Sequence, residues 1–358
     1  MKKRIEYLDY LRVFALISII AIHIFGIIRT RYLGVNNTYY HLFTFADSFT
    51  RAGVPLFLML TGYLVLSTKK ELQYKDFIKK RLPKLIIPFF IISIFYYIYI
   101  VIDRNLSYGI IDFIERFTTN NIMYHLWYMY VIIVIYLLIP FEKRLLDNLK
   151  EKELLILIIL TYVLGNIFYS VSLFSIRYEH GILGGFNLPT LLIYNNYLVL
   201  GYYLSKHELK NKRIIYILGA LSLIIMPIVD AFFIENNLRN DAMLNATSIF
   251  PIFYTLGIYQ IVKDNYKKIK IPLFIKKQIV RISDLSLYIY LLHVLVLDFI
   301  SRNLNKIWIQ NRLYENVLVF FILLIGTFIG SYILSIIFNY LYNKTKEIIN
   351  KNFKKKKK

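Results

Sequence analysis

The sequence contains no cysteine, and this absence removes several kinds of chemistry at once. Disulfide bonds, thiolate nucleophiles and cysteine-based metal sites are all excluded. The chain also contains no phosphate-binding glycine loop and no HExxH pair, so it gives no indication of an ATP-driven machine or a zinc hydrolase. We therefore expect neither a metal site nor a bound cofactor.

Acidic residues are scarce as well. There are 22 Asp and Glu against 44 Lys and Arg, which gives a formal net charge of +22. A charge of this size can indicate a nucleic-acid partner. Here, however, the basic residues lie in short segments between apolar runs, and that distribution is typical of charges that orient a membrane protein. We expect membrane lipids, and no nucleic acid, as partners.

Long apolar runs are what the sequence has in abundance. Hydrophobic residues make up 58% of the chain, against about 45–50% in soluble domains. Runs of about 20 apolar residues recur throughout, and a helix of that length spans the ~30 Å hydrocarbon layer. We predict an all-α polytopic membrane protein with about ten transmembrane helices in one bundle. The predicted spans are 8–28, 45–66, 85–102, 122–140, 154–174, 188–205, 214–234, 245–262, 284–301 and 316–342.

The Lys and Arg counts of the connecting segments predict which side of the membrane each one faces. Alternate segments, counted from the N-terminus, hold 33 Lys and Arg, whereas the segments between them hold 10. Positive charge collects in short cytoplasmic loops, so we predict that both termini are cytoplasmic. The inside set is the N-terminus, 67–84, 141–153, 206–213, 263–283 and the C-terminal tail; the outside set is 29–51, 103–121, 175–187, 235–244 and 302–315. We predict one transmembrane domain at 1–345 and a basic cytoplasmic tail at 346–358.

The first predicted span contains charged side chains at positions within the bilayer, where their insertion free energy is unfavourable. A charged side chain inside the bilayer costs about 2.5–3.5 kcal/mol on insertion scales, so such residues are functional candidates. Arg12 and His23 are eleven positions apart and therefore share one helix face, about 16 Å apart along the axis. Asp9 precedes Arg12 by three residues and can pair with it. We predict that Arg12 grips an anionic donor near the cytoplasm and that His23, further out, acts as a general base. The alternative is that Asp9 and Arg12 reach the inner interface and that His23 is a hydrogen-bonded core residue.

A second group of basic residues lies at the inner start of the third predicted span. Arg81 and Lys84, with Lys79 and Lys80 beside them, form a predicted docking patch for the phosphates of a donor. The alternative is that they are ordinary cytoplasmic charges.

The outer side contributes candidates for binding an acceptor or supporting its binding: Arg51, His125, Trp127, Tyr290 and His293. Taken alone, Trp127 would be a routine interfacial anchor, and His293 would be a core histidine. Asp230 and Asp298 are further acids within predicted spans, and the sequence assigns them no partners.

Several of these motifs, in this order, resemble the acyltransferase-3 family of integral membrane acyltransferases. Leu8-Asp9-Tyr10-Leu11-Arg12 followed by His23 resembles the first-helix signature, and Val54 to Tyr63 resembles the second-helix motif, with Thr61 where Ser is usual. The segment Phe77 to Pro88 resembles the basic segment of the third helix, with Lys84 in place of a common second arginine, which keeps the charge but loses the bidentate fork. Two further motifs also fit the family pattern: His125-Leu126-Trp127-Tyr128, and the segment Ser286 to His293. Together, the motifs cover the chain from residue 7 to about 295.

The resemblance implies an O-acyltransferase that uses acyl-CoA, expected to be acetyl-CoA, and a sugar hydroxyl as acceptor. It also implies that Arg12 and His23 are essential. Within the family, Arg51-Ala52-Gly53-Val54-Pro55 and Tyr124-His125-Leu126-Trp127 look most like stand-alone O-acetyltransferases that modify surface polysaccharides, of the enterobacterial common antigen type. The expected partners are thus acyl-CoA and a glycan or lipid-linked glycan, and the expected location is the bacterial cell membrane. The acceptor sugar, the acyl group, the oligomeric state (a homo-oligomer included) and the choice between direct transfer and an acyl-enzyme stay open.

Two other functions fit part of the sequence. A transporter or flippase for a glycan intermediate or small solute would also place polar groups within the membrane, but the chain shows no duplicated halves, which many transporters have. An assembly subunit for polysaccharide synthesis would be expected to have large exposed loops, and the predicted outside segments are short.

Overall fold

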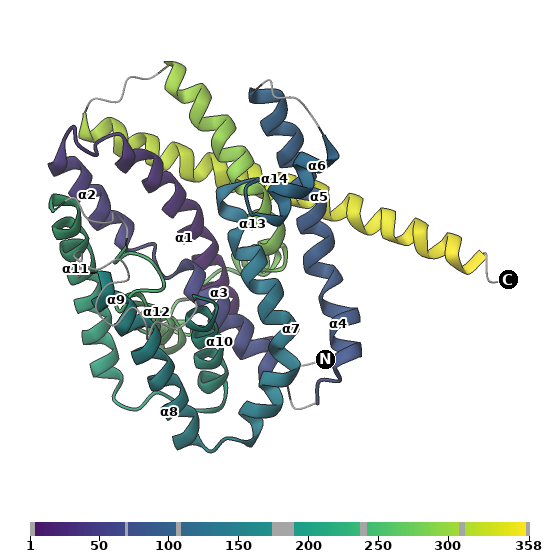
Figure 1. The fold of residues 1–358 in the computed structure, drawn as a ribbon, viewed down its shortest axis with the longest axis horizontal. Coiled ribbons are helices and arrows are strands. Elements are labelled where there is room, and N and C mark those ends of the chain that lie inside the picture. The colour runs from purple at the N-terminus through teal and green to yellow at the C-terminus, as the bar shows by residue number, and fades with distance from the viewer. Residues whose placement is uncertain are drawn as a thin grey trace. The chain divides into compact units, whose positions relative to one another are not determined.

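The structure, a computed structural model, describes residues 4–68, 71–104, 109–173, 190–236, 242–307 and 312–355, and every regular element in these ranges is a helix (Figure 1). The α-helices are α1 Glu6–Thr30, α2 Asn37–Ser48, α3 Gly53–Thr61, α4 Tyr74–Arg81, α5 Pro83–Arg104, α6 Ile110–Thr118, α7 Trp127–Asn148, α8 Glu151–Tyr162, α9 Phe168–Leu173, α10 Thr190–Lys206, α11 Lys212–Glu235, α12 Pro251–Asn265, α13 Leu273–Ile307 and α14 Leu313–Lys355. Two π-helical turns, η1 Gly62–Leu66 and η3 Val163–Ile167, and one 3-10 turn, η2 Tyr124–Leu126, interrupt or precede them.

Eight helical stretches in the described part of the chain are long and apolar enough to cross a membrane. They are Glu6–Thr30, Asn37–Leu66, Tyr74–Asp103, Tyr124–Asn148, Glu151–Leu173, Lys212–Glu235, Leu273–Leu304 and Leu313–Ile348. The predicted all-α, polytopic class is therefore confirmed.

The other two predicted spans, 188–205 and 245–262, coincide with helices α10 and α12. These helices have 17 and 15 residues, fewer than the ~20 that cross a bilayer unaided. The first two residues of the span predicted at 188–205 lie outside the described residues. Most of α10 is buried, so its backbone is covered by protein, which is the condition under which a short helix is tolerated at membrane depth.

Two predicted outside segments contain helices that sequence reasoning did not expect. The segment 29–51 contains α2, whose first turn is capped by Asn36: the side-chain carbonyl accepts a hydrogen bond from the Tyr39 N–H at 3.1 Å. The segment 103–121 contains α6, where Tyr97 of α5 donates a hydrogen bond to Asp112 at 2.8 Å. Both helices are short and amphipathic, so a search for long apolar runs misses them.

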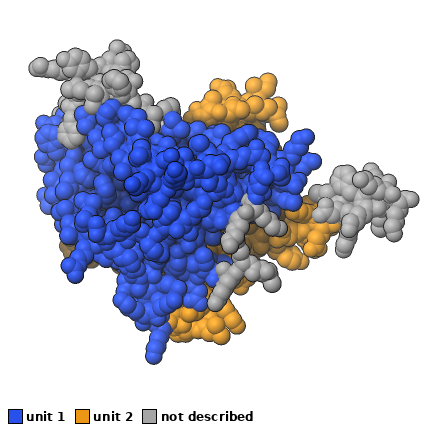
Figure 2. Space-filling view, turned by 90° about the horizontal axis from the view of Figure 1, so that it is seen from below, with its two compact units in different colours: residues 1–87, 127–270 blue, residues 88–126, 271–358 orange. Residues whose placement is uncertain are grey.

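The chain divides into two compact units. Unit 1 contains residues 1–87 and 127–270, and unit 2 contains residues 88–126 and 271–358, so the division falls inside α5 and just before α7 (Figure 2). This division reflects contact density. The domain at 1–345 and the tail at 346–358 stay a prediction, and α14 continues without a break to Lys355.

Ion pairs in unit 1 bring together segments that the charge count assigned to the cytoplasmic side. The segments 67–84, 141–153, 206–213 and 263–283 are cross-linked at one end of the unit. The pairs are Arg144–Glu71, Lys206–Asp147, Lys210–Glu151, Lys263–Glu208 and Lys212–Asp264, at 2.8–3.8 Å. Because α10 ends and α11 begins in this group, α10 runs toward the group and α11 runs away from it.

Predicted outside segments also meet. In unit 1, His41 lies 3.4 Å from Glu235, which joins the start of α2 to the end of α11. In unit 2, Arg302 pairs with Asp103, which joins α13 to the end of α5. Within each unit, these pairs therefore join segments that were predicted to lie on the same side.

Two glycines allow α10 to cross the second span at backbone contact. A Cβ built on Gly62 would lie 1.9 Å from the carbonyl oxygen of Leu198, and one built on Gly201 would lie 1.9 Å from that of Met59. No side chain fits in either place. Gly62 is also the first residue of η1, so the π-helical turn begins where the two backbones touch.

Candidate active site

Arg12 and His23 both lie on α1, which is helical without interruption from Glu6 to Thr30. Their eleven-residue spacing therefore places them on one face, with an axial separation of about 16 Å. Both side chains are half-buried. Asp9, one turn before Arg12, is buried and accepts two hydrogen bonds from Arg4, at 2.7 and 2.8 Å.

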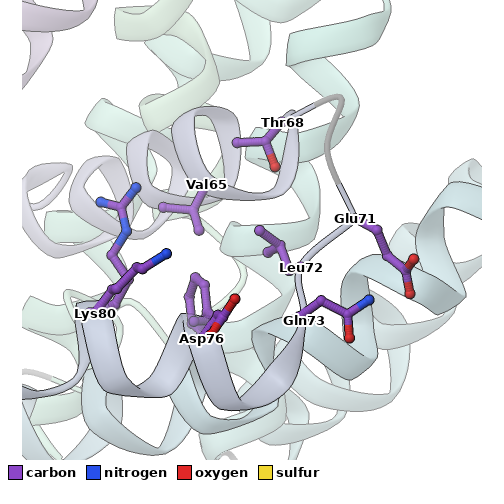
Figure 3. A pocket seen from close by; sticks show the side chains of 9 residues that line it. Val65, Thr68, Glu71, Leu72, Gln73, Asp76 and Lys80 are labelled. Atoms are coloured by element: carbon purple, nitrogen blue, oxygen red, sulfur yellow. The ribbon is translucent and has the colours of Figure 1, made fainter.

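A pocket of about 300 Å³ opens at the inner end of unit 1 (Figure 3). Figure 3 shows Lys80 and Asp76 directed from α4 toward Val65, whereas the head group of Glu71 points away from the pocket. The lining consists of Val65 and Thr68 at the end of the second span, Glu71, Leu72 and Gln73 in the connection, and Asp76, Phe77, Lys80 and Arg81 on α4. The lining therefore combines apolar side chains with two cations, Lys80 and Arg81, and two acids, Asp76 and Glu71. The cations can bind the anionic part of a ligand that also has an apolar part.

Only one of the two predicted donor-binding residues lines this pocket. Arg81 lines it, whereas Lys84, which is exposed at the start of α5, is not among its lining residues. Lys80 lines the pocket instead. Lys80 and Arg81 end α4, and Leu82, which has right-handed helical backbone angles, joins α4 to α5.

The pocket is backed by α7, and this brings Arg12 and Arg81 into one neighbourhood. The ring of Phe77 packs on that of Tyr136 with centroids 6.0 Å apart. The positive charges of Arg12 and Arg81 both act on the phenol of Tyr136. Arg12 also acts on Tyr128, two turns earlier on α7. Two cations that are 69 positions apart in the sequence thus converge on one tyrosine, and no local sequence signal predicts this.

Arg51 lies in a buried cluster at the outer end of unit 1. It pairs with Asp47, one turn earlier, and Arg29 of α1 approaches the same carboxylate at 3.2 Å. Thr50 donates a hydrogen bond to Asp47 at 2.8 Å, and Arg29 donates one to Thr44 at 3.2 Å. The cluster ties α1 to the second span. Sequence reasoning missed Arg29 and Asp47, although the i, i+4 spacing of Asp47 and Arg51 is a usable signal.

His125, Tyr290 and His293 come together in unit 2 and are buried there. The rings of His125 and His293 lie 5.1 Å apart. His125 Nε2 donates to the carbonyl of Leu291 at 3.3 Å, and the Tyr290 hydroxyl donates in return to the carbonyl of His125. This reciprocal pair fastens the turn before α7 to α13.

Trp127 does not share the surroundings of His125, although only one residue separates them. Its ring packs on Tyr194 of α10 in unit 1, with centroids 5.2 Å apart. His23 likewise belongs to unit 1, and His125 and His293 belong to unit 2.

The structure shows the environment of Asp298 and Asp230, the two acids to which the sequence assigned no partners. Asp298 accepts a hydrogen bond from Tyr99 and pairs with Arg302 at 2.9 Å, so it belongs to a network near the outer end of unit 2. Asp230 is fully buried in α11. Within the described ranges, no three His, Asp or Glu side chains gather as a metal site would require.

Three comparisons with known proteins give one match. No curated protein and no solved structure matches significantly. Residues 5–336, however, match a family model described as an acyltransferase domain, and this range contains α1, the inner pocket and both histidines of unit 2. The chain, a polytopic helical membrane protein, therefore belongs to the acyltransferase-3 family.

Proposed function

We propose that this protein is a membrane O-acyltransferase that moves an acyl group, expected to be acetyl, from cytoplasmic acyl-CoA to a hydroxyl of a surface glycan or its lipid-linked precursor. The observation that carries the proposal is the inner pocket, which Lys80 and Arg81 line together with apolar side chains. The charges of Arg81 and Arg12 both act on Tyr136, which packs on Phe77 of the same pocket. A donor that combines phosphates with an apolar arm matches that distribution.

The donor phosphates bind Lys80 and Arg81, and the positive end of the site extends to Arg12. Guanidinium groups suit this task because they hold phosphate oxygens in a bidentate fork. Lys84 is exposed three residues beyond Arg81 and adds to the positive field that draws in the anionic donor. Asp9, which Arg4 already holds, fixes the start of α1 and does not compete for the donor.

The thioester arm extends from Arg12 along α1 to His23. The axial distance of about 16 Å between the two residues suits an extended arm better than a compact ligand. A thioester delivered this way approaches the outer half of the membrane while the phosphates stay at the inner side. The acyl group therefore crosses most of the bilayer without the whole donor crossing it.

His23 supplies the proton transfer. In direct transfer, its neutral imidazole removes the proton of the acceptor hydroxyl as the oxygen attacks the thioester carbonyl. The new C–O bond forms, the C–S bond breaks, and the proton passes to the departing CoA thiolate. In the two-step alternative, the imidazole carries the acyl group briefly before the hydroxyl takes it. The outer residues Arg51, Trp127, His125, Tyr290 and His293 are assigned to acceptor binding or its support.

The glycan acceptor is supported by sequence resemblance alone. The outer motifs around Arg51 and His125 are similar to those of stand-alone O-acetyltransferases of surface polysaccharides. Mass analysis of surface glycans from cells with and without the protein tests this part. Loss of a 42 Da acetyl increment when the gene is removed is the result expected from the mass of the added group, and unchanged glycans would contradict it.

The donor half of the proposal can be tested without knowing the acceptor. Because the chain has no cysteine, Thr68→Cys places a single thiol at the rim of the pocket. Acetyl-CoA should protect this thiol from a maleimide in proteoliposomes, whereas a dephospho analogue of lower charge should protect it less. Equal labelling with and without acetyl-CoA would count against the pocket. Turnover of acetyl-CoA without an ion gradient would separate this function from that of a transporter.

A further inference from the structure

Lys143 is a buried lysine in a membrane protein. It lies on α7 near the inner end and is 4% exposed. Burying an ammonium group costs several kcal/mol unless it is fully hydrogen-bonded and paired. Its Nζ donates to the carbonyl oxygen of Leu66 at 3.1 Å and to Asp147 at 2.5 Å. The position of this lysine is therefore fixed by specific contacts.

The carbonyl that Lys143 binds is at the end of the π-helical turn η1. The last carbonyls of a helix have no partner within it. In a π-turn, each hydrogen bond spans five residues, one more than in an α-helix. Leu66 is the last residue of η1 and is followed by Ser67, where the helix stops. Lys143 supplies the hydrogen bond that the helix itself cannot.

The same turn forms one wall of the pocket. Val65 and Thr68 line the pocket, on either side of Leu66 and Ser67. The turn is fixed at its start as well: Tyr63 accepts a hydrogen bond from Tyr7 of α1 at 3.1 Å, and Gly62 packs on Leu198. Lys143 is thus the contact that fixes the end of the turn nearest the pocket.

A second contact from α7 to the pocket is much weaker. Arg144 pairs with Glu71 at 3.2 Å, but the two side chains are 55% and 62% exposed. Such exposed pairs contribute little. The buried contact of Lys143 is the one expected to hold the wall in place.

We propose that Lys143 is a positioning residue for the donor pocket: its bond to the Leu66 carbonyl holds η1 so that Val65 and Thr68 shape the site for acyl-CoA. This inference rests on the proposed donor function. Lys143 does not touch the donor. Asp147 neutralises its charge, and Asp147 is itself held by Tyr202 at 2.6 Å and Lys206 at 3.0 Å.

The test compares Lys143→Met with Lys206→Met in proteoliposomes supplied with acetyl-CoA. Both changes remove a cation from Asp147, but only the first removes the bond to η1. Lys143→Met is expected to raise the KM for acetyl-CoA about tenfold, the effect of losing a hydrogen bond to a charged donor, with kcat at saturating acetyl-CoA within about twofold. Lys206→Met should leave both values near wild type. Lys143→Arg keeps a cationic donor at similar reach, so its KM for acetyl-CoA should lie between that of Lys143→Met and that of the wild type.

Three results would overturn the inference. One is an unchanged KM in Lys143→Met, and another is an equal rise in Lys206→Met, which would point to the charge of Asp147 instead. If Lys143→Met does not fold, the measurement is made on Lys143→Gln, which stays polar but is too short to replace the lysine bond to the Leu66 carbonyl, combined with Thr68→Cys. Protection by acetyl-CoA equal to that of Thr68→Cys alone is the third. Failure of the wild-type protein to turn over or bind acetyl-CoA would overturn the proposed function as well, so the two failures are distinguishable.

Discussion

Gly62 packs against the backbone of Leu198 so closely that a Cβ at Gly62 would lie 1.9 Å from the Leu198 carbonyl oxygen. The neighbour is backbone, so it cannot turn away as a flexible side chain would. The crossing of the second span and α10 therefore depends on the absence of one methyl group. Because η1 begins at Gly62, the same contact sets where the pocket wall starts.

Gly62→Ala should destabilise the protein. Overpacking of this kind costs about 1–3 kcal/mol or more, and here α10 must shift. Thermal unfolding in detergent measures the effect. The matched control is Gly26→Ala on α1, where nothing lies within 4 Å of the added Cβ; alanine there should be neutral or stabilising by about 0.5–1 kcal/mol. Similar unfolding of the two variants would contradict the close crossing.

His23→Ala should abolish acyl transfer while leaving donor binding intact. The imidazole is expected to act on the acceptor proton, whereas the donor phosphates are assigned to Lys80 and Arg81 of the inner pocket. Transfer of labelled acetyl groups and protection of the thiol in Thr68→Cys are the two readouts. His41→Ala, at the outer end of unit 1, is the control because that histidine pairs with Glu235. Transfer retained by a folded His23→Ala protein would remove His23 from the mechanism.

Arg81→Ala should weaken the donor affinity, with a KM for acetyl-CoA raised about tenfold by the loss of charge-assisted bonds. Arg81→Lys should recover only part of the loss, because the fork is gone. Lys84→Ala should have a smaller effect, since Lys84 does not line the pocket. Steady-state kinetics at two salt concentrations provide the measurement, and added salt should weaken the wild type more than Arg81→Ala. A larger effect for Lys84 than for Arg81 would move the donor site away from the pocket.

Asp47→Asn should destabilise unit 1 strongly. The carboxylate is fully buried and is shared by Arg29 and Arg51, and removing one partner of a buried ion pair costs about 3–5 kcal/mol. Thermal unfolding measures the loss. Asp112→Asn is the comparison: its pair with Arg116 has the same i, i+4 spacing but is largely solvent-accessible, so its loss should destabilise the protein much less. Equal costs would show that the Asp47 cluster is solvated.

Acidification should loosen α6 from α5. The hydrogen bond from Tyr97 and the charge of Arg116 lower the pKa of Asp112 below its usual value. A lowered pKa stabilises the folded state above the unfolded pKa of about 3.9, and this contribution is lost as the pH falls through the lower folded value. Hydrogen exchange of residues 110–118 between pH 6 and pH 3 is the measurement. Exchange that rises equally in Asp112→Asn would assign the change to another group.

The sequence by itself determined the all-α, polytopic class of the protein and most of its spans, and the side that each connection faces stays a prediction. These features depend on local quantities: the apolar length needed to cross a bilayer and the charge of the loops on each side. It also placed Arg12 and His23 on one face, because a single helix fixes that relationship without help from the rest of the chain. The family followed from the order of such local motifs.

Only the tertiary structure decided how the site is built. The convergence of Arg12 and Arg81 on Tyr136, the bond from Lys143 to the Leu66 carbonyl and the crossing at Gly62 join residues that are far apart in the chain. The same is true of Arg29 and Asp47, and of Tyr290 and His125. Such contacts arise when helices pack, and packing depends on the shapes of several faces at once, which the periodicity of one segment does not encode.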